Sequence, residues 1–359
     1  MSAPAVDRFR RWTLGGGAAL CTVGLAACPP GSAPAPPPAP APSTVAAHTV
    51  PTTSALVASF DLPREERSRE LSGLTWDAST RTLYAISDHI RNIVPLTPSE
   101  RFDTWTLGEP IPLDVPEPWD GEGIALIDGG FVVANEAGPH LYELDRKGAF
   151  RRELPIPAHC SMAVPNASFE SLSLAPSGRY LFTGNERALR IDGPPPTVDR
   201  GSTVRLLRMD RTTGVGREVA YRTDPIFAQG DHGEIGVSDV AALSDTELLV
   251  LERAYVPIAG NQIRIYRVDV TRGADVLDVP NLSPDSPVVP KTLVLDLVDV
   301  AGEDRRQGAG PHPLFANYEG IALGPKLPDG RRMVFLVSDD NGHIEQSARL
   351  LTLALPGLP

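Results

Sequence analysis

Residues 120–136 read DGEGIALIDGGFVVANE, and variants of this stretch occur four more times along the chain. Each copy opens with an acidic or small polar residue and a small residue. These residues are followed by an aliphatic run, a turn and a second strand-like run that ends near an acid. The other four copies open at Ser72, Glu170, Ser238 and Glu319 and close at Asp88, Glu186, Glu252 and Asp339. Several short strands repeated about every 40–50 residues are typical of a β-propeller.

The number of blades is predicted from the length of the globular part. From about Val50 to Pro359 the chain consists of short apolar runs between Gly, Pro, Asp and Asn turns, which is the pattern of β-hairpins. Roughly 300 residues at about 40–50 per blade give six or seven units. We therefore predict an all-β, six-bladed propeller, with five or seven blades as alternatives and a degenerate repeat between Val240 and Ile321. Residues 56–62 (LVASFDL) and 349–355 (RLLTLAL) are both strand-like, so we expect the terminal strands to share a blade and close the ring.

The N-terminal region indicates export. Three arginines precede the apolar, glycine-rich segment 12–27, which is shorter than a typical transmembrane helix. This pattern is typical of a signal peptide, here over residues 1–27. Residues 25–28 (LAAC) resemble a bacterial lipobox, so we expect Cys28 to be lipidated. Residues 10–14 (RRWTL) also resemble a twin-arginine export motif. Residues 28–49, rich in proline and alanine, predict a tether between the lipidated cysteine and a globular domain over residues 50–359.

The charge of the chain suits cations rather than nucleic acid. The formal net charge is −12, and no basic run is present. Phosphate backbones require clustered Lys and Arg, so we expect no nucleic-acid partner. Removal of the signal would leave Cys28 and Cys160, which excludes a disulfide within the domain if Cys28 is lipidated. We expect a monomer at the cell envelope, on the periplasmic face or the outer membrane.

Four of the strings resemble a known family. They are LSGLTWDASTRTLYAISDH (71–89), DGEGIALIDGGFVVANE (120–136), NASFESLSLAPSGRYLFTGNE (166–186) and NYEGIALGPKLPDGRRMVFLVSDDN (317–341). Together they look like the phytase-like domain family, described as "esterase-like activity of phytase". The resemblance implies an exported propeller acting on a phosphoric or carboxylic ester. The opening of each repeat is also similar to calcium-dependent lactonases and strictosidine-synthase-type propellers, in which such a Glu helps to hold one central metal.

The repeated acids form two candidate rings around the propeller axis. The first comprises the predicted metal ligands at the starts of the inner strands, with Ser72 as a neutral exception: Glu122, Glu170, Asp239 and Glu319. The second lies at the ends of the following strands: Asp88, Glu136, Glu186, Glu252 and Asp339. Converging carboxylates raise one another's pKa, and calcium, which takes six to eight oxygen ligands, would relieve this repulsion. The alternative is a structural ring, in which the acids bind backbone amides or a neighbouring Arg.

Histidines and arginines near these rings add candidate roles in the chemistry. Asp88, Glu136, His89 and His343 are the predicted catalytic groups, because a His beside a metal-bound water can move a proton in ester hydrolysis. Arg187 and Arg253 follow two of the acids and could bind phosphate bidentately. Both could instead pair with those acids.

The sequence leaves three functions open. The first is hydrolysis of a small-molecule ester such as a phosphoester, with calcium in a carboxylate-rich central site. The second is a non-catalytic binding or scaffold propeller of the cell envelope, and the third is a lactonase-like hydrolase. No G-x-S-x-G nucleophile elbow, Walker loop or dinucleotide loop supports a different kind of enzyme.

Overall fold

The computed structural model describes residues 55–359, apart from 231, 258, 302–313, 344–345 and 347. The predicted signal peptide (1–27), the lipidated Cys28 and the tether (28–49) lie outside the described residues. None of the helices in the described ranges is long and apolar enough to cross a membrane.

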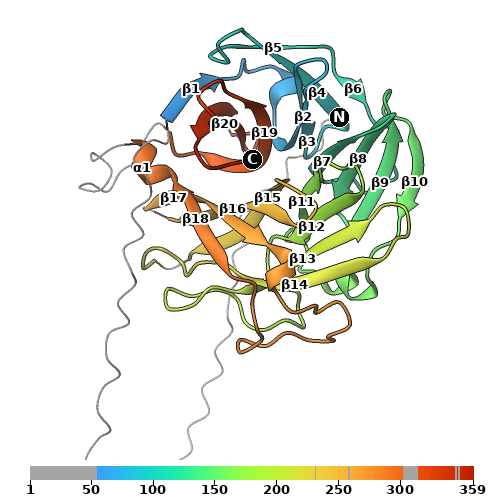
Figure 1. The fold of residues 1–359 in the computed structure, drawn as a ribbon, viewed down its shortest axis with the longest axis vertical. Coiled ribbons are helices and arrows are strands. Elements are labelled where there is room, and N and C mark those ends of the chain that lie inside the picture. The colour runs from blue at the N-terminus through green and yellow to red at the C-terminus, as the bar shows by residue number, and fades with distance from the viewer. Residues whose placement is uncertain (1–54, 231, 258, 302–313, 344–345, 347) are drawn as a thin grey trace, which may run out of the picture. The chain divides into compact units, whose positions relative to one another are not determined.

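The described residues form five antiparallel sheets arranged around one axis (Figure 1). The first sheet contains β2 (Leu71–Asp77), β3 (Thr82–Ser87), β4 (Asn92–Pro98), β5 (Trp105–Leu107) and β6 (Ile111–Pro112). The second contains β7 (Gly121–Ile127), β8 (Gly130–Asn135), β9 (His140–Asp145) and β10 (Phe150–Leu154). The third contains β11 (Phe169–Leu174), β12 (Tyr180–Asn185), β13 (Thr203–Asp210) and β14 (Gly216–Arg222).

The remaining two sheets complete the arrangement. The fourth contains β15 (Glu234–Ala242), β16 (Glu247–Val256), β17 (Gly260–Asp269) and β18 (Lys291–Asp296). The fifth contains β19 (Asn317–Lys326), β20 (Arg332–Asp339), β21 (Arg349–Leu355) and β1 (Ala55–Asp61). Short helices connect some of the strands: η1 (Glu66–Ser68), η2 (Ala158–Met162), η3 (Val270–Arg272) and α1 (Leu297–Ala301). The inner strands β2, β7, β11, β15 and β19 contact one another in this order, and β19 contacts β2.

The prediction of an all-β propeller is confirmed, but the prediction of six blades is wrong. The described residues contain five blades, and no degenerate blade lies between Val240 and Ile321 in the part of that interval that the structure describes. Long strands β16 and β17, of 10 residues each, use part of this interval. The connection from β17 to β18 runs along the outer strand β14 of the third blade, where Val276 N donates to Glu218 O at 2.9 Å and Val289 N donates to Ala220 O at 2.8 Å. A length-based count therefore assigns too many blades.

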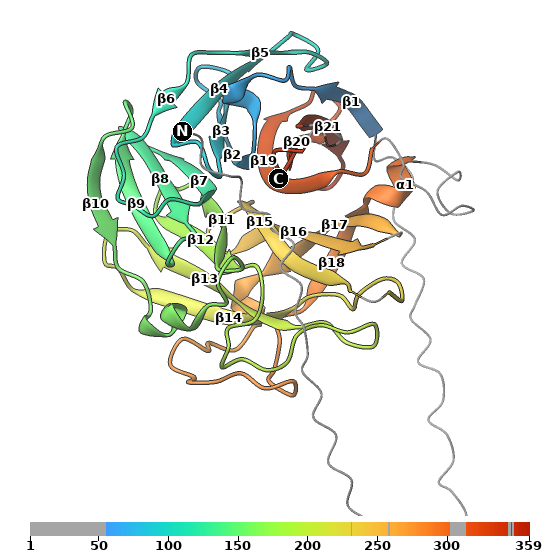
Figure 2. The same cartoon turned by 180° about the vertical axis from the view of Figure 1, so that it is seen from behind.

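The first and last strands lie in the same sheet. β1 is antiparallel to β21, with Ala55 opposite Ala354 and Asp61 opposite Arg349. Figure 2 shows β1 beside β21 from behind. Asp61 also accepts a 2.6 Å hydrogen bond from Arg349 Nε. The outer edge of β21 is thereby covered by a segment that is almost 300 residues earlier in the chain.

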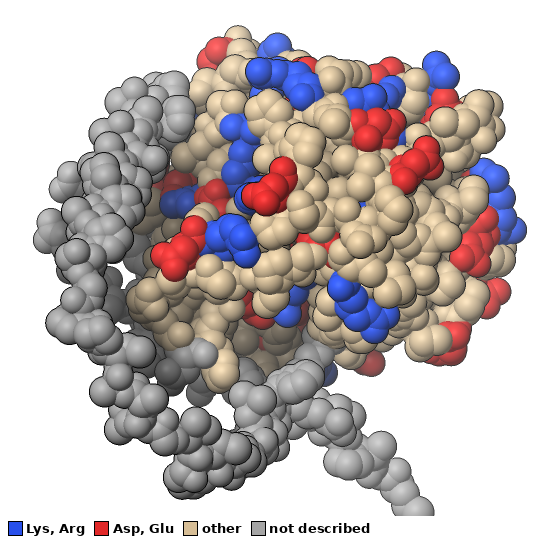
Figure 3. All heavy atoms as spheres, turned by 90° about the horizontal axis from the view of Figure 1, so that it is seen from below, with Lys and Arg blue, Asp and Glu red and all other residues tan. Residues whose placement is uncertain are grey.

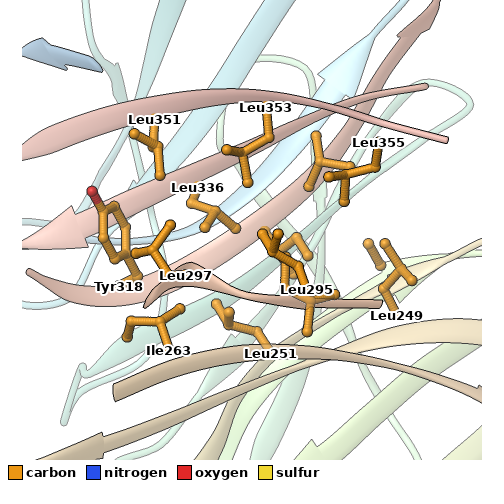
Figure 4. Close-up of a cluster of buried hydrophobic side chains, with 14 of the residues drawn as sticks. Leu249, Leu251, Ile263, Leu295, Leu297, Tyr318, Leu336, Leu351, Leu353 and Leu355 are labelled. Carbon is orange, nitrogen blue, oxygen red and sulfur yellow. The ribbon is translucent and has the colours of Figure 1, made fainter. Parts of the chain in front are cut away.

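A separate apolar cluster fills each space between consecutive blades. The cluster between the fourth and fifth blades includes Leu249, Leu251, Leu336 and Leu351, all fully buried (Figure 4). The other four clusters lie between the remaining neighbours in the same way. Strands covered on both faces are mainly apolar, as in β8, where every residue is buried and residues 130–134 are apolar. On the face seen in Figure 3, basic and acidic residues are interspersed among uncharged ones.

Candidate functional site

A β-bulge recurs at the same place in the inner strand of every described blade. The pairing register shifts between Leu71 and Leu74, Gly121 and Ile124, Phe169 and Ser171, Val237 and Asp239, and Tyr318 and Gly320. A bulge bends its strand and re-aims a side chain. The residues that occupy it are Ser72, Glu122, Glu170, Ser238 and Glu319. The repeated acids of the sequence therefore coincide with a repeated backbone irregularity near the axis.

The two predicted rings of acids meet at one end of the axis. In each blade the inner strand and its neighbour are antiparallel, so the start of one strand lies beside the end of the other. Gly121 is opposite Asn135, for example, and Phe169 is opposite Asn185. The carboxyl groups of Glu136 and Glu170, one from each ring, are hydrogen-bonded to each other. We call the acids and arginines that contact or face one another there the axial cluster: Asp120, Glu122, Glu136, Glu170, Glu186, Glu234, Glu319, Asp339, Arg187 and Arg253.

Asp239 binds backbone amides on the axis. In the register of the repeats its equivalents are the small residues Gly73, Gly123, Ser171 and Gly320, and the bulge position in its blade is Ser238. Its Oδ1 accepts from Val240 N at 2.8 Å and from Leu172 N at 3.2 Å, and its Oδ2 accepts from Ile321 N at 2.8 Å. The amide of Leu74 is a fourth donor. Burial raises the pKa of Asp239, and these four amides oppose the rise. These contacts match the structural alternative for this residue, rather than the metal ligand that we expected.

Glu252 was assigned to the second ring, but the structure places Arg253 near the axis instead. Glu252 accepts hydrogen bonds from the Tyr221 hydroxyl, from Asp224 N at 2.9 Å and from Lys291 Nζ at 2.6 Å. These partners belong to the interface between the third and fourth blades. A one-residue difference in register exchanges the two faces of a strand. The fourth blade therefore presents a guanidinium group where the other blades present a carboxylate.

Three carboxylates of the axial cluster lie close enough to share a cation. One oxygen from each of Asp120, Glu122 and Glu136 lies within 4.8 Å of the others. We call these residues the carboxylate triad. Burial raises the pKa of Glu122 well above its usual value, and the charges of Glu319, Asp120 and Glu136 raise it further. Burial likewise raises the pKa of Glu136 to about 7. Asp120 was missed in the sequence because it lies in the connection before β7, although it precedes Glu122 by only two residues.

Glu122 and Glu136 of the triad also contact neutral groups. Ser72 Oγ donates to Glu122 Oε2 at 2.6 Å, and Ser168 N donates to Glu136 Oε1 at 2.7 Å. Within the described ranges, neither Glu122 nor Glu136 forms an ion pair with Lys or Arg. Burial, together with the charges of Glu122, Glu136 and Glu186, raises the pKa of Glu170 well above its usual value. Ionisation of all three carboxyl groups of Glu122, Glu136 and Glu170 is therefore unfavourable.

Arginines neutralise the other half of the axial cluster. Arg253 lies 3.0 Å from Glu186, 3.5 Å from Glu234 and 3.6 Å from Glu319. Arg187 lies 3.3 Å from Glu186 and 2.6 Å from Glu234. We call these five residues the arginine network. The acids raise the pKa of Arg253 despite its burial, so its charge is retained. Both arginines predicted to bind phosphate are thus engaged by carboxylates.

The predicted catalytic residues are only partly brought together. His89 Nδ1 contacts Asp88 and lies 3.9 Å from Asp120, so Asp88, His89 and Asp120 form a second group adjoining the triad. Asp339 is buried, and burial together with the charge of Glu319 raises its pKa. His343 is exposed on the loop after β20, and no contact among the described residues joins its ring to His89 or to the triad.

The triad fits a hard divalent cation better than a soft one. It offers carboxylate oxygens, which suit calcium and magnesium. Calcium tolerates the irregular geometry of side chains that come from strand β7, the connection before it and the turn after β8. Candidate ligands in this group are Asp120, Glu122 and Glu136, and Glu170 adjoins them through Glu136.

Comparison with known proteins identifies the family. No curated protein matches the chain. Among solved structures, endo-arabinase from Bacteroides thetaiotaomicron is 14% identical with a TM-score of 0.44, and the match covers 83% of this chain and 96% of that one. Glutaminyl cyclase from Myxococcus xanthus is 11% identical with a TM-score of 0.40, covering 83% and 97%. Hydrazine synthase from Kuenenia stuttgartiensis is 11% identical with a TM-score of 0.37, covering 79% of this chain but only 62% of that one, less than two thirds. The family model "Phytase-like: Esterase-like activity of phytase" matches residues 67–342, most of the described propeller, and the chain therefore belongs to the phytase-like family.

Proposed function

We propose that the protein is an ester hydrolase that binds a divalent cation, with calcium favoured, at the carboxylate triad. The observation that carries the proposal is the asymmetry of the axial cluster. The arginine network neutralises Glu186, Glu234 and Glu319, whereas Glu122 and Glu136 have no Lys or Arg partner among the described residues. Buried carboxylates at this spacing repel one another, and a hard cation relieves the repulsion.

The chain's own residues would provide proton transfer. A divalent cation supplies Lewis-acid polarisation of an ester oxygen when it is bound. Glu136 and Glu170 share a hydrogen bond between their carboxyl groups, so one of them holds a proton that can be given to a departing alkoxide. Asp88 contacts Nδ1 of His89 and orients the ring for proton transfer at Nε2. The side chain of His89 is 46% exposed, so a substrate can reach it from solvent.

The family description supports an ester substrate but does not say whether the ester is formed by a carboxylic or a phosphoric acid. "Esterase-like" and "phytase" name carboxylic and phosphoric esters respectively, and lactones are cyclic carboxylic esters. All three are substrates that this proposal admits.

A non-catalytic scaffold of the cell envelope is the second candidate. It is favoured by the contacts of Asp239, which binds four amides, and by the arginine network. In such a protein the remaining acids would serve rigidity alone.

Thermal unfolding with EDTA and with added calcium separates the two candidates. A ligand at a hundredfold excess over its Kd stabilises the native state by about 2.7 kcal/mol, which raises the Tm by a few degrees. We expect a calcium-specific rise for the chain from Thr44 onward. Glu122→Gln should abolish the rise, and Glu109→Gln, whose side chain is 98% exposed, should retain it. An unchanged melting curve would favour the scaffold.

We also propose that the protein is exported and held at the membrane through a lipid on Cys28. The lipobox-like residues 25–28 and the proline-rich segment that follows support this proposal. Cys28→Ala should move the protein from the membrane fraction to the soluble fraction of the producing cell. Mass spectrometry of the mature N-terminus should find an acylated Cys28, and an unmodified cleaved terminus would contradict the proposal.

A further inference from the structure

We propose that the axial site selects esters that carry no negative charge, and that uncharged and cationic esters are its substrates while phosphate monoesters are excluded. This inference rests on the proposed function of the axial cluster. It depends on three features of the described residues: the partners of the arginines, the excess of acidic groups in the axial cluster, and the aromatic side chains beside its carboxylates.

The two arginines of the axial cluster are already paired. Arg253 contacts three carboxylates at 3.0–3.6 Å, and its side chain is only 11% exposed. Arg187 contacts two, the closer at 2.6 Å. Phosphate is recognised by guanidinium groups with donors available for bidentate bonds. A phosphate here would have to displace Glu186 or Glu234, and the displaced carboxylates would then repel it.

Carboxyl groups outnumber guanidinium groups at the site. The axial cluster contains eight carboxyl groups and two guanidinium groups, a formal charge of −6. An excess of acidic groups attracts cationic ligands and repels anionic ones, and such fields change rates of association by about 10–10³-fold. A dianionic phosphate monoester is repelled, and a cation is attracted.

Aromatic side chains lie beside the carboxylates. The indole of Trp119 covers Gly121, where an added Cβ would lie 2.1 Å from its ring, and its Nε1 donates to Ser87 O at 3.4 Å. Trp119 therefore lies between the chain segments that carry Asp88 and Glu122. Tyr255, 38% exposed, is directly opposite Glu234 across the β15–β16 pair. Aromatic faces bind apolar groups and cations such as quaternary ammonium. The negative face of an aromatic ring does not attract a phosphate.

Matched substrates test the selection directly. The 4-nitrophenyl esters of butyric acid, of succinic acid (monoester) and of 4-(trimethylammonio)butyric acid have acyl chains of similar length and release the same chromophore. We expect kcat/KM to fall in the order cationic, uncharged, anionic, with about a hundredfold span, and 4-nitrophenyl phosphate to be hydrolysed most slowly. Raising the salt concentration should slow the cationic ester and accelerate the anionic one. An anionic ester hydrolysed as fast as the uncharged one would overturn the inference.

A variant of the arginine network provides a second test. Glu234→Gln removes a carboxylate that contacts both arginines, so hydrolysis of the succinate monoester should rise at least tenfold relative to the butyrate ester. The exposed Glu109→Gln makes the same change of net charge and should leave the ratio unaltered. An unchanged ratio in Glu234→Gln would contradict the role given to the arginine network.

Calorimetry keeps the inference testable if no ester is hydrolysed. Phenyltrimethylammonium and phenyl phosphate are titrated into the full-length protein in calcium-containing buffer. Tighter binding of the ammonium supports the selection even if the proposed hydrolysis fails. Tighter binding of the phosphate refutes the selection, even if hydrolysis and calcium binding are both established.

Discussion

Asp239 shows how a single carboxylate can join several blades. Its two oxygens accept amides from β11 and β19, from its own strand and, through Leu74, from β2. Each amide left buried without an acceptor costs about 1–3 kcal/mol. We predict that Asp239→Ala lowers the free energy of unfolding by more than about 3 kcal/mol, measured by urea denaturation. Asp285→Ala, at an exposed loop position, should change it by less than about 0.5 kcal/mol. Equal effects of the two substitutions would contradict the axial role of Asp239.

The carboxyl pair Glu136–Glu170 should make the stability of the calcium-free protein depend on pH. The pKa of Glu136 is raised from 4.5 to about 7, so the folded state binds more protons than the unfolded state between these values. Stability is therefore highest near pH 5 and falls as the pH rises towards 8. The raised pKa values of Glu122, Glu170 and Asp339 act in the same direction. For Glu136 alone the loss is up to about 3 kcal/mol.

Denaturation in EDTA across this range measures the effect. Glu136→Gln should make the free energy of unfolding depend less on pH, because an amide does not titrate. Calcium should also reduce this pH dependence if the ion binds the ionised triad. A stability that rises from pH 5 to pH 8 in EDTA would contradict the assignment.

At the scale of the element, the inner strands approach one another too closely for most side chains. A Cβ added to Gly320 would lie 2.3 Å from the carbonyl oxygen of Ser72, a backbone atom that cannot move aside alone. We predict that Gly320→Ala destabilises the propeller by about 2 kcal/mol or more through this overpacking. Gly108→Ala, whose nearest neighbour is Pro95 Cβ at 3.3 Å, should be tolerated far better. Thermal unfolding of the two variants checks this, and similar Tm values would exclude crowding at the axis.

The alternation of small, acidic and aliphatic residues predicted the hairpins and most of the residues at the axis, but not the register of the fourth blade. Ser238-Asp239 and Glu252-Arg253 each contain an acid, and a shift of one residue decides which side chain faces the axis. That shift depends on the bulge between Val237 and Asp239, which composition does not reveal. Asp120 was missed for another reason: it belongs to a connection, where no repeat marks its position.

For the whole molecule, the number of blades depends on where connections run rather than on length. The segment after β17 could have formed a sixth blade, but it lies against β14 instead. The buried Arg205 fixes it there, with hydrogen bonds to Val276 O at 3.1 Å and Val279 O at 3.0 Å and an ion pair with Asp192 at 2.6 Å. Breaking a buried ion pair typically costs about 3–5 kcal/mol. We predict a loss of this size for Arg205→Ala in urea denaturation, whereas Arg272→Ala at an exposed position should have little effect. A small loss for both variants would show that the segment is held in some other way.

The strand β1 is the remaining long-range connection, and its removal should weaken the entire propeller. Without residues 1–62 the outer edge of β21 would lose its hydrogen-bonding partner, along with the Asp61–Arg349 ion pair. Unpaired strand edges bind other chains, so we predict a lower Tm and aggregation for the chain starting at Pro63, compared with the chain starting at Thr44. A synthetic peptide of residues 54–62 should raise the Tm of the shortened chain by adding a strand to the open edge. The same peptide with its sequence scrambled should not. If the shortened chain melts at the same temperature and remains monomeric, the pairing of β1 with β21 contributes nothing to stability.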